Sequence, residues 1–158
     1  MTAPGPERER EHVRVADLRP GDRLPVLTVT PGPEQLFFFS AAVYNGHRIH
    51  YDRGWAVDVE GHPGVLVQGA LQTAWLARVV TDWAGPSARL VRFGSRNRGS
   101  AVAGETLTFS GAVTAVHHDG DRVVVDLELT GANAAGEVLM PGEATVSFPA
   151  AGTPRDQP

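Results

Sequence analysis

Nearly continuous apolar character marks the segment from Gln68 to Trp83 as the central helix of this chain. Its narrow polar side is made by Gln72, Thr73, Arg78 and Asp82. A helix that is apolar nearly all round is buried rather than laid on a surface. Gly85 and Pro86 then end it. We therefore predict one long, buried helix.

Most of the remaining chain alternates apolar and polar residues with a period of two, which is typical of strands with one buried face. The segments with this pattern are 24–30, 105–116 and 122–130, and strands are also expected over 88–93 and 137–148. Asp119-Gly120 is a hairpin signal between two of them, and Pro141-Gly142 predicts a bulge or an edge position in the last one. Residues 34–43 could form a helix or a strand, and Glu34 and the alanine pair favour a short helix. Another short helix is expected over 52–59, with Asp52 capping its start. One strand, a buried helix and a run of antiparallel strands predict an α+β fold whose sheet wraps the helix.

Length and local composition set the expected domain boundaries. At 158 residues the chain is long enough for one domain with its own core. Residues 1–11 are charged and rich in proline and glycine, and residues 150–158 are similar, so both ends are predicted to be flexible tails. The folded domain is expected over residues 12–149.

The overall charge and residue content argue against several classes of function. A formal net charge of −4, with 14 basic residues spread along the chain, gives no clustered positive face for nucleic acid. The absence of cysteine removes disulfides, zinc–thiolate sites and cysteine nucleophiles. The sequence shows neither a signal pattern nor an apolar run long enough to span a bilayer. We therefore expect a cytoplasmic protein that binds neither nucleic acid nor membranes.

Polar chemistry is concentrated in one short stretch, Tyr44-Asn45-Gly46-His47-Arg48-Ile49-His50-Tyr51-Asp52. Histidine has the ordinary pKa best suited to proton transfer near neutral pH. A second stretch, Gly64-Val65-Leu66-Val67-Gln68-Gly69-Ala70-Leu71, opens the long helix. Free backbone N–H groups and the helix dipole favour negative charge at such a position. We expect the first stretch to supply catalytic side chains and the second to supply an electrophilic pocket.

The order of these motifs resembles the MaoC-like hydratases and dehydratases of the hot-dog fold. The resemblance is closest to the branch of mesaconyl-CoA hydratase-like proteins and type 2 hydroxyacyl-thioester dehydratases. Besides residues 45–52, it rests on Gly61-His62-Pro63-Gly64 before Val67-Gln68-Gly69-Ala70-Leu71, and on Gly104-Glu105-Thr106-Leu107 after Arg96-Asn97-Arg98. It spans residues 15–148. It implies a single α+β hot-dog domain, with an antiparallel sheet around a central helix, in a homodimer whose site lies near the subunit interface.

The same resemblance implies an enzyme that interconverts 3-hydroxyacyl and 2-enoyl thioesters of CoA or of an acyl carrier protein. His50 falls on the family's general acid and base. Asn45 falls where the wider family has an aspartate, so it would position water but cannot carry a proton. The backbone N–H groups of Gly69 and Ala70 would bind the enolate oxygen. Gln68 would hydrogen-bond inside the pocket or take a cap-like role at the helix start.

Several of these residues keep a second interpretation. His50 and Asn45 could instead satisfy a turn. Asp52 is expected to cap the next helix or to orient His50, with the cap favoured, and Arg48 to anchor the loop through a carbonyl or a carboxylate. A metal site at His47, His50 and Asp52 lacks a further ligand set, because structural zinc usually has four ligands. We expect no metal.

Basic residues are concentrated at Arg89, Arg92, Arg96 and Arg98. Arg96 and Arg98 are candidate contacts for the phosphates of CoA or phosphopantetheine, because guanidinium suits phosphate geometry. Solvated surface charges are the alternative. No cofactor is expected beyond the CoA or phosphopantetheine that the substrate carries. Expected partners are the thioester and a second subunit, in a homodimer or in a heterodimer with a related hot-dog subunit. The alternatives to this enzyme are a non-catalytic hot-dog subunit or acyl-binding module, and a hot-dog thioesterase.

Overall fold

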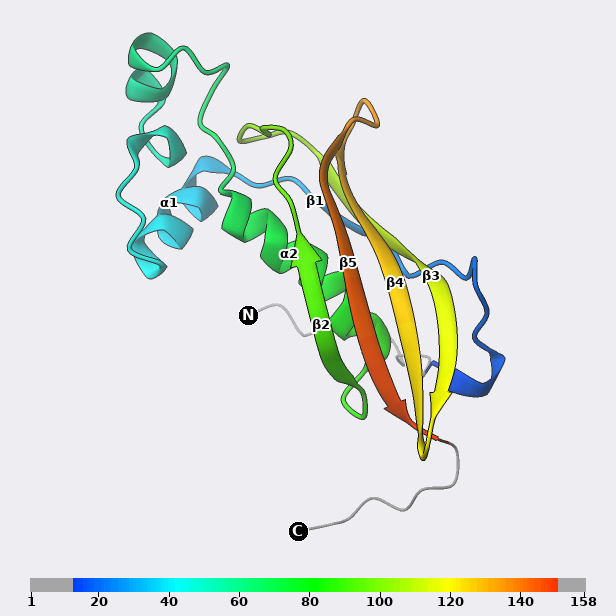
Figure 1. Cartoon of the computed structure of the whole chain (residues 1–158). Coiled ribbons are helices and arrows are strands. Elements are labelled where there is room, and N and C mark those ends of the chain that lie inside the picture. The colour runs from blue at the N-terminus through cyan, green and yellow to red at the C-terminus, as the bar shows by residue number, and fades with distance from the viewer. Residues whose placement is uncertain (1–12, 151–158) are drawn as a thin grey trace, which may run out of the picture.

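A curved antiparallel sheet with a helix across one face forms the body of the molecule (Figure 1). The computed structural model describes residues 13–150, so the predicted tails lie outside the described residues apart from Ala150. The sheet has five strands in the order β1-β3-β4-β5-β2. β1 and β2 are therefore its two edges, and the long helix lies between them in sequence. This is the predicted arrangement of a sheet around a helix.

The strands follow the alternating segments of the sequence. Their bounds are Leu27–Val29 (β1), Arg89–Ser95 (β2), Leu107–Asp119 (β3), Arg122–Asn133 (β4) and Val138–Pro149 (β5). Every pairing is antiparallel, and the hairpin of β3 and β4 closes at Asp119 and Arg122. Gly120 has a φ of 57°, a conformation that glycine adopts freely, as the predicted turn requires.

α2 (Gly69–Ala84) is the predicted central helix, and it supplies much of the core. Leu76 and Val80 are fully buried. The ring of Trp75 lies 5.7 Å from the ring of Phe109 on β3, measured between centroids. Full burial of one such apolar side chain stabilises the fold by about 1.5–3 kcal/mol. The nearly all-round apolar character of this helix is thus explained by its position against the sheet.

Shorter helical segments lie beside the start of α2 (Figure 1). α1 (Pro33–Ala42) begins with proline at its first position, in agreement with the predicted helix over 34–43. The turn η2 (Arg48–His50) is a 3-10 helix, and η3 (Trp55–Val59) is a π-helix. We call α1, η2 and η3 the helical arm. Among the described residues, no helix combines the length and apolar character needed to cross a bilayer.

The Pro141-Gly142 pair lies in an inner strand, so the edge position predicted as one alternative is wrong. β5 pairs with β4 on one side and with β2 on the other, where the last pair is Ser95 with Gly142. Beyond that point the Arg96 N–H still donates to the Pro141 carbonyl oxygen at 3.0 Å. The register of β5 shifts close by, opposite Gly131 and Ala132. Pro141 thus lies just past the end of β2, and its carbonyl oxygen continues the hydrogen bonding between β5 and the chain that follows β2.

Gly142→Ala is expected to destabilise the fold. A Cβ at this position would lie 2.8 Å from the Gly94 carbonyl oxygen and 2.8 Å from Leu76 Cδ2. The carbonyl belongs to the backbone of the adjacent strand, so we expect a loss of about 1–3 kcal/mol in the free energy of unfolding, measured in urea. Gly54→Ala is the control, because Gly54 has helical φ and ψ and its nearest neighbouring atom lies at 3.6 Å. Equal losses in both variants would contradict the packing argument.

Candidate active site

The loop that follows α1 is fixed by its own hydrogen bonds. Tyr44 adopts a φ of 54°, a left-handed conformation that is uncommon outside glycine and turns the chain after the helix. The Asn45 N–H donates to the Ser40 carbonyl oxygen at 2.9 Å, and Asn45 Oδ1 accepts from the His47 N–H at 3.1 Å. The Asn45 side chain therefore shapes the turn, while its Nδ2 has no hydrogen-bond partner among the described residues.

His50 lies in the 3-10 turn η2 and is partly buried. Its Nδ1 is 2.9 Å from the Leu66 carbonyl oxygen. A carbonyl oxygen can only accept, so Nδ1 carries the proton and the lone pair of the neutral ring is on Nε2. Within residues 13–150, Nε2 has no hydrogen-bond partner. This is the tautomer that a general base needs.

Leu66 joins this histidine to the start of α2. Its N–H donates to the Ile49 carbonyl oxygen at 2.8 Å, and its own carbonyl oxygen accepts from the His50 ring. Leu66 therefore binds two adjacent residues of η2. Leu66 precedes Gly69 by three residues, which places their Cα atoms at most about 11 Å apart. The structure therefore brings His50 and the first turn of α2 into one region.

Two backbone N–H groups at the start of α2 are unpaired. The Gln68 carbonyl oxygen accepts from the N–H groups of Leu71 and Gln72, each at 3.1 Å. The N–H groups of Gly69 and Ala70 make no hydrogen bond to any described residue. Free N–H groups at a helix start, together with the helix dipole, favour an anion. The geometry is that expected of an oxyanion site, and the binding of an enolate oxygen there stays a prediction.

Gln68 precedes α2 as its N-cap, but its side chain makes no capping hydrogen bond. The cap-like position predicted as one alternative is therefore confirmed for the backbone, without a contribution from the side chain. The side chain is 1% exposed, and Nε2 donates to the Leu36 carbonyl oxygen at 2.8 Å and to Ser40 Oγ at 2.9 Å. Both acceptors belong to α1, so Gln68 fixes α1 to the start of α2. A direct contact between Gln68 and substrate stays a prediction.

Ser40 was missed by the sequence analysis. It is 4% exposed and lies in α1 with its hydroxyl against Gln68. The only signal in the sequence is that Ser40 is a lone polar residue in the apolar run 36–43. A buried serine needs a hydrogen-bond partner, but that partner comes from a distant part of the chain. The sequence alone could not identify it.

Asp52 caps the helical segment that follows, as predicted. Its Oδ1 accepts from the Trp55 N–H at 3.0 Å. Arg48 anchors the loop through the same carboxylate, with Nη2 2.6 Å from Oδ2, and its guanidinium lies 4.1 Å from the centroid of the Trp55 ring. The Trp55 N–H, followed by Arg48, lowers the pKa of Asp52 below its ordinary value because both favour the ionised carboxylate. Asp52 and Arg48 are therefore scaffold for the loop.

The residues of the alternative metal site face different partners. His47 Nε2 lies 3.6 Å from Glu60 Oε1, His50 faces a carbonyl oxygen, and Asp52 is bound by Arg48. Within residues 13–150, no group of three His, Asp or Glu side chains is placed to hold a metal ion.

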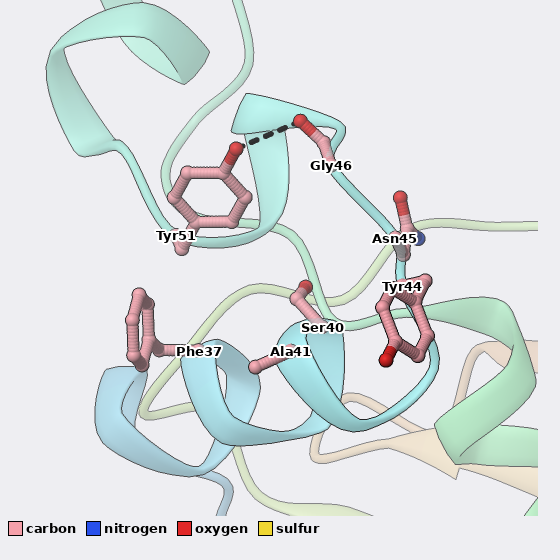
Figure 2. Close-up of a pocket in the computed structure, with 7 residues that line it drawn as sticks. All are labelled: Phe37, Ser40, Ala41, Tyr44, Asn45, Gly46 and Tyr51. Atoms are coloured by element: carbon pink, nitrogen blue, oxygen red, sulfur yellow. Dashed lines mark hydrogen bonds between the residues drawn. The ribbon is translucent and has the colours of Figure 1, made fainter.

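A pocket of ≈ 380 Å³ opens between α1 and the loop that follows it (Figure 2). It is lined by Phe37, Ser40, Ala41, Tyr44, Asn45, Gly46 and Tyr51. Figure 2 shows the Ser40 hydroxyl pointing away from α1 toward the loop, where the Tyr51 hydroxyl donates to the Gly46 carbonyl oxygen at 2.7 Å. Asn45 lines this pocket, whereas His50 does not. No hydrogen bond joins the Asn45 and His50 side chains in the described part of the chain, so the predicted pair shares one loop without a direct contact.

The Arg96-Asn97-Arg98 segment passes beside the start of α2. The backbone N–H groups of Arg96 and Arg98 donate to carbonyl oxygens of β5, at 3.0 and 2.8 Å. Between them, the Asn97 side chain lies against Gly69, with Nδ2 3.4 Å from where a Cβ on that glycine would be. Arg96 and Arg98 are exposed and line a second pocket of ≈ 310 Å³ together with Glu143. The two arginines therefore flank a residue that touches the candidate oxyanion site.

Asp52→Asn is expected to lower stability at neutral pH, because it removes the charge that binds Arg48 and strengthens the cap at Trp55. The lowered pKa of Asp52 means that its carboxylate stabilises the fold above the ordinary carboxyl range, and that this contribution is lost as the pH falls through the lowered value. Urea unfolding should therefore show a gap between wild type and variant at pH 7 that shrinks below about pH 4. Asp82→Asn, in a surface pair with Arg78, is the control and should change stability less. A gap that is independent of pH would contradict this assignment.

Comparison with known proteins identifies the family. Residues 3–102 match the protein family described as hydroxyacyl-thioester dehydratase type 2. Over 117 residues the chain is 35% identical to the 3-oxo-4,17-pregnadiene-20-carboxyl-CoA hydratase beta subunit of Mycobacterium tuberculosis, covering 74% of this chain and 87% of that protein. It is 57% identical over 44 residues to mesaconyl-C(4)-CoA hydratase of Chloroflexus aurantiacus, which is 28% of this chain and 16% of the length of that relative.

Solved structures agree on the fold. The ChsH1-ChsH2 complex from Mycobacterium tuberculosis contains a chain that matches with a TM-score of 0.71 at 30% identity, over 82% of this chain and 98% of that one. A MaoC-like dehydratase from Rhodospirillum rubrum shows the same fold at 19% identity, with a TM-score of 0.73 over 87% of this chain and 97% of that one. The predicted hot-dog fold is thus confirmed, and the predicted enzyme class, a hydratase or dehydratase of thioesters, agrees with the matched family and with the hydratases among its relatives. The chain belongs to the hydroxyacyl-thioester dehydratase type 2 family, and it shares its hot-dog fold with MaoC-like proteins.

Proposed function

We propose that this protein adds water across the double bond of a 2-enoyl thioester, and that it catalyses the reverse dehydration of the 3-hydroxyacyl thioester. One observation carries the proposal. The free Nε2 of His50 and the two unpaired N–H groups of α2 are linked through Leu66, within three residues of the helix start. Hydration needs a base for the water and donors for the thioester oxygen, where enolate charge develops. This short link supplies both kinds of group.

His50 acts as the base and then as the acid. Nε2 takes a proton from water as the water oxygen bonds to the β-carbon and the double-bond electrons move toward the thioester. The same proton is then delivered to the α-carbon, so that the net change is the addition of one water. The bond from Nδ1–H to the Leu66 carbonyl oxygen holds the ring in one tautomer. Dehydration follows the same steps in reverse.

The N–H groups of Gly69 and Ala70 bind the thioester oxygen. They are fixed by the helix, so little reorganisation is needed as negative charge develops on that oxygen. A glycine at the first position lets the substrate approach the backbone closely. Because the buried Gln68 side chain holds the helix start against α1, these donors stay in place relative to the loop that carries His50.

Asn45 positions the water or the substrate hydroxyl. Its Oδ1 already accepts the His47 N–H, and Nδ2, which has no partner among the described residues, is left to donate from a residue that lines the pocket. An amide cannot take up the proton, so His50 alone carries it in both directions. The proposed reaction uses only these protein groups, and CoA or phosphopantetheine takes part solely as the carrier of the acyl group.

The carrier is proposed to extend past Asn97 toward Arg96 and Arg98. The Asn97 side chain lies against Gly69, and the exposed Arg96 and Arg98 on either side of it in the sequence line the pocket beside β5. Guanidinium binds phosphate with paired N–H donors. Glu143 lines the same pocket, but its carboxylate is bound to Arg92. Phosphates of CoA or of a carrier protein are the groups that these two arginines suit.

A second subunit is proposed to pair along β2. This strand is one of the two edges of the sheet, and its exposed residues include Leu90 and Val91. Unpaired N–H and C=O groups of an edge strand favour pairing with another chain. A second copy of this chain is the simplest partner. The Mycobacterium tuberculosis relative is named a beta subunit, and the matching structure is a complex of two different proteins, which supports a related hot-dog subunit as the alternative.

His50→Ala is expected to lower kcat/KM for hydration of an enoyl-CoA by about 10²–10⁴-fold, because the base is lost. Asn45→Ala should cost less, about tenfold, because it removes only a positioning group. The assay follows the loss of enoyl absorbance of crotonyl-CoA and longer enoyl-CoAs. His118→Ala is the matched control, since His118 is exposed near the hairpin end of β3 and lines neither of the two pockets, and it should retain activity.

Each other outcome of this assay has a definite meaning. Hydration that is unaffected by His50→Ala would contradict the mechanism. Release of free CoA without a hydroxyacyl product would favour a thioesterase. Binding of acyl-CoA without any turnover would favour a non-catalytic acyl-binding module.

Val91→Asp is expected to shift the protein toward the monomer, because it places a buried charge in the proposed β2 interface. Sedimentation velocity over a range of concentrations measures the change. Val138→Asp is the control, because Val138 is similarly exposed but begins the inner strand β5. A wild-type protein that stays monomeric at every concentration would contradict the homodimer, and a co-purifying hot-dog protein would then identify a heterodimer.

A further inference from the structure

The pocket beside Asn45 contains no charged group. Its seven lining residues are aromatic, small or neutral and polar. Phe37 and Tyr51 lie next to each other on one side of its wall, with ring centroids 6.1 Å apart in an edge-to-face arrangement. Concave sites of about 300–1,000 Å³ with mostly apolar walls are typical of small-molecule binding. At ≈ 380 Å³, this pocket has the size and the lining of a site for a medium-sized apolar group.

The arginines nearest to this pocket along the chain, Arg48 and Arg53, do not line it. Arg48 is bound to Asp52, with Nη2 2.6 Å from Oδ2, and its guanidinium lies over the ring of Trp55. Arg96 and Arg98 line a different pocket, next to β5. A carboxylate on the acyl group would therefore enter the site beside Asn45 without an opposite charge, and burying an unpaired carboxylate is costly.

Ser40 gives this wall one buried polar group with a fixed direction. Its Oγ accepts from Gln68 Nε2, so its own O–H is left to donate. Figure 2 shows this hydroxyl pointing from α1 toward the loop. Together with the Asn45 amide it offers hydrogen bonds to a neutral oxygen, such as a water or a hydroxyl, at the Asn45 end of an otherwise apolar site. Neither group compensates a full negative charge.

We propose that this pocket binds the acyl group of the thioester and selects an uncharged, apolar acyl chain over a dicarboxylic one. The inference rests on the proposed function, since it concerns the substrate of the same site. It assigns Phe37 and Ala41 as specificity-determining residues and Ser40 as a positioning residue for the water or hydroxyl. The aromatic wall stabilises the apolar chain by burial, and the lack of a cation excludes a terminal carboxylate.

Purified full-length protein is tested with crotonyl-CoA, trans-2-octenoyl-CoA and mesaconyl-CoA. We expect kcat/KM for octenoyl-CoA to exceed that for mesaconyl-CoA by at least about 100-fold. A preference for mesaconyl-CoA would overturn this inference while leaving the proposed hydration intact. Hydration of none of the three would instead overturn the proposed function, and this inference with it.

Variants of two adjacent aromatic residues test whether this pocket is the acyl site. Phe37→Ala should lower kcat/KM for octenoyl-CoA about tenfold or more and change that for crotonyl-CoA far less, because only the longer chain reaches the ring. Phe38→Ala is the control, since Phe38 is adjacent and more exposed but does not line the pocket. Equal effects of the two variants on octenoyl-CoA would overturn the assignment.

Ala41→Arg tests the charge argument by adding the missing cation. We expect this variant to lose activity with octenoyl-CoA and to gain at least about tenfold in kcat/KM with mesaconyl-CoA, because the guanidinium pairs with the free carboxylate of the mesaconyl group. Circular dichroism and thermal unfolding check that the variant is folded. A folded variant with an unchanged ratio of the two substrates would overturn the role of this pocket in acyl selection.

Discussion

Burial of α2 against the sheet is the constraint on which the rest of the structure depends. A sixteen-residue helix with residues such as Leu76 and Val80 fully buried has one stable place, across the face of the sheet. In its first turn, the N–H groups of Gly69 and Ala70 have no partner among the described residues. Unpaired donors at a helix start are a general result of helix geometry. In this fold, core packing places them beside the polar loop.

Two hydrogen bonds turn this packing into a site. The buried Gln68 amide fixes α1 to the start of α2, and the His50 ring is bound to Leu66 just before it. Side chains on loops are usually less precisely held than those on helices or strands. Here α1, which precedes the loop, is bound to Gln68 at the start of α2, and His50 within the loop is bound to Leu66. A base on a loop therefore keeps a defined position relative to donors on the helix.

The elements could be predicted from the sequence because each has a local cause. The period-two segments became strands, Pro33 begins α1, and Asp52 caps the turn that follows it. His50 stood out because its neighbours form an ordered motif. The Ser40–Gln68 contact could not be predicted, since it joins residues 28 apart and depends on how two helices pack. The edge position for Pro141 failed for the same reason, because strand order follows from the whole sheet.

Asparagine at position 45 connects the catalytic loop with the choice of substrate. Its Oδ1 accepts the His47 N–H as an aspartate carboxylate would, so the turn keeps its geometry while the negative charge is absent. An aspartate would place a charge at one end of a pocket whose other lining residues are neutral. In the proposed reaction, asparagine leaves proton transfer to His50, and the pocket carries no charge of its own. In that proposal, the residue that restricts the proton chemistry to one histidine also keeps the neighbouring site suited to an apolar acyl group.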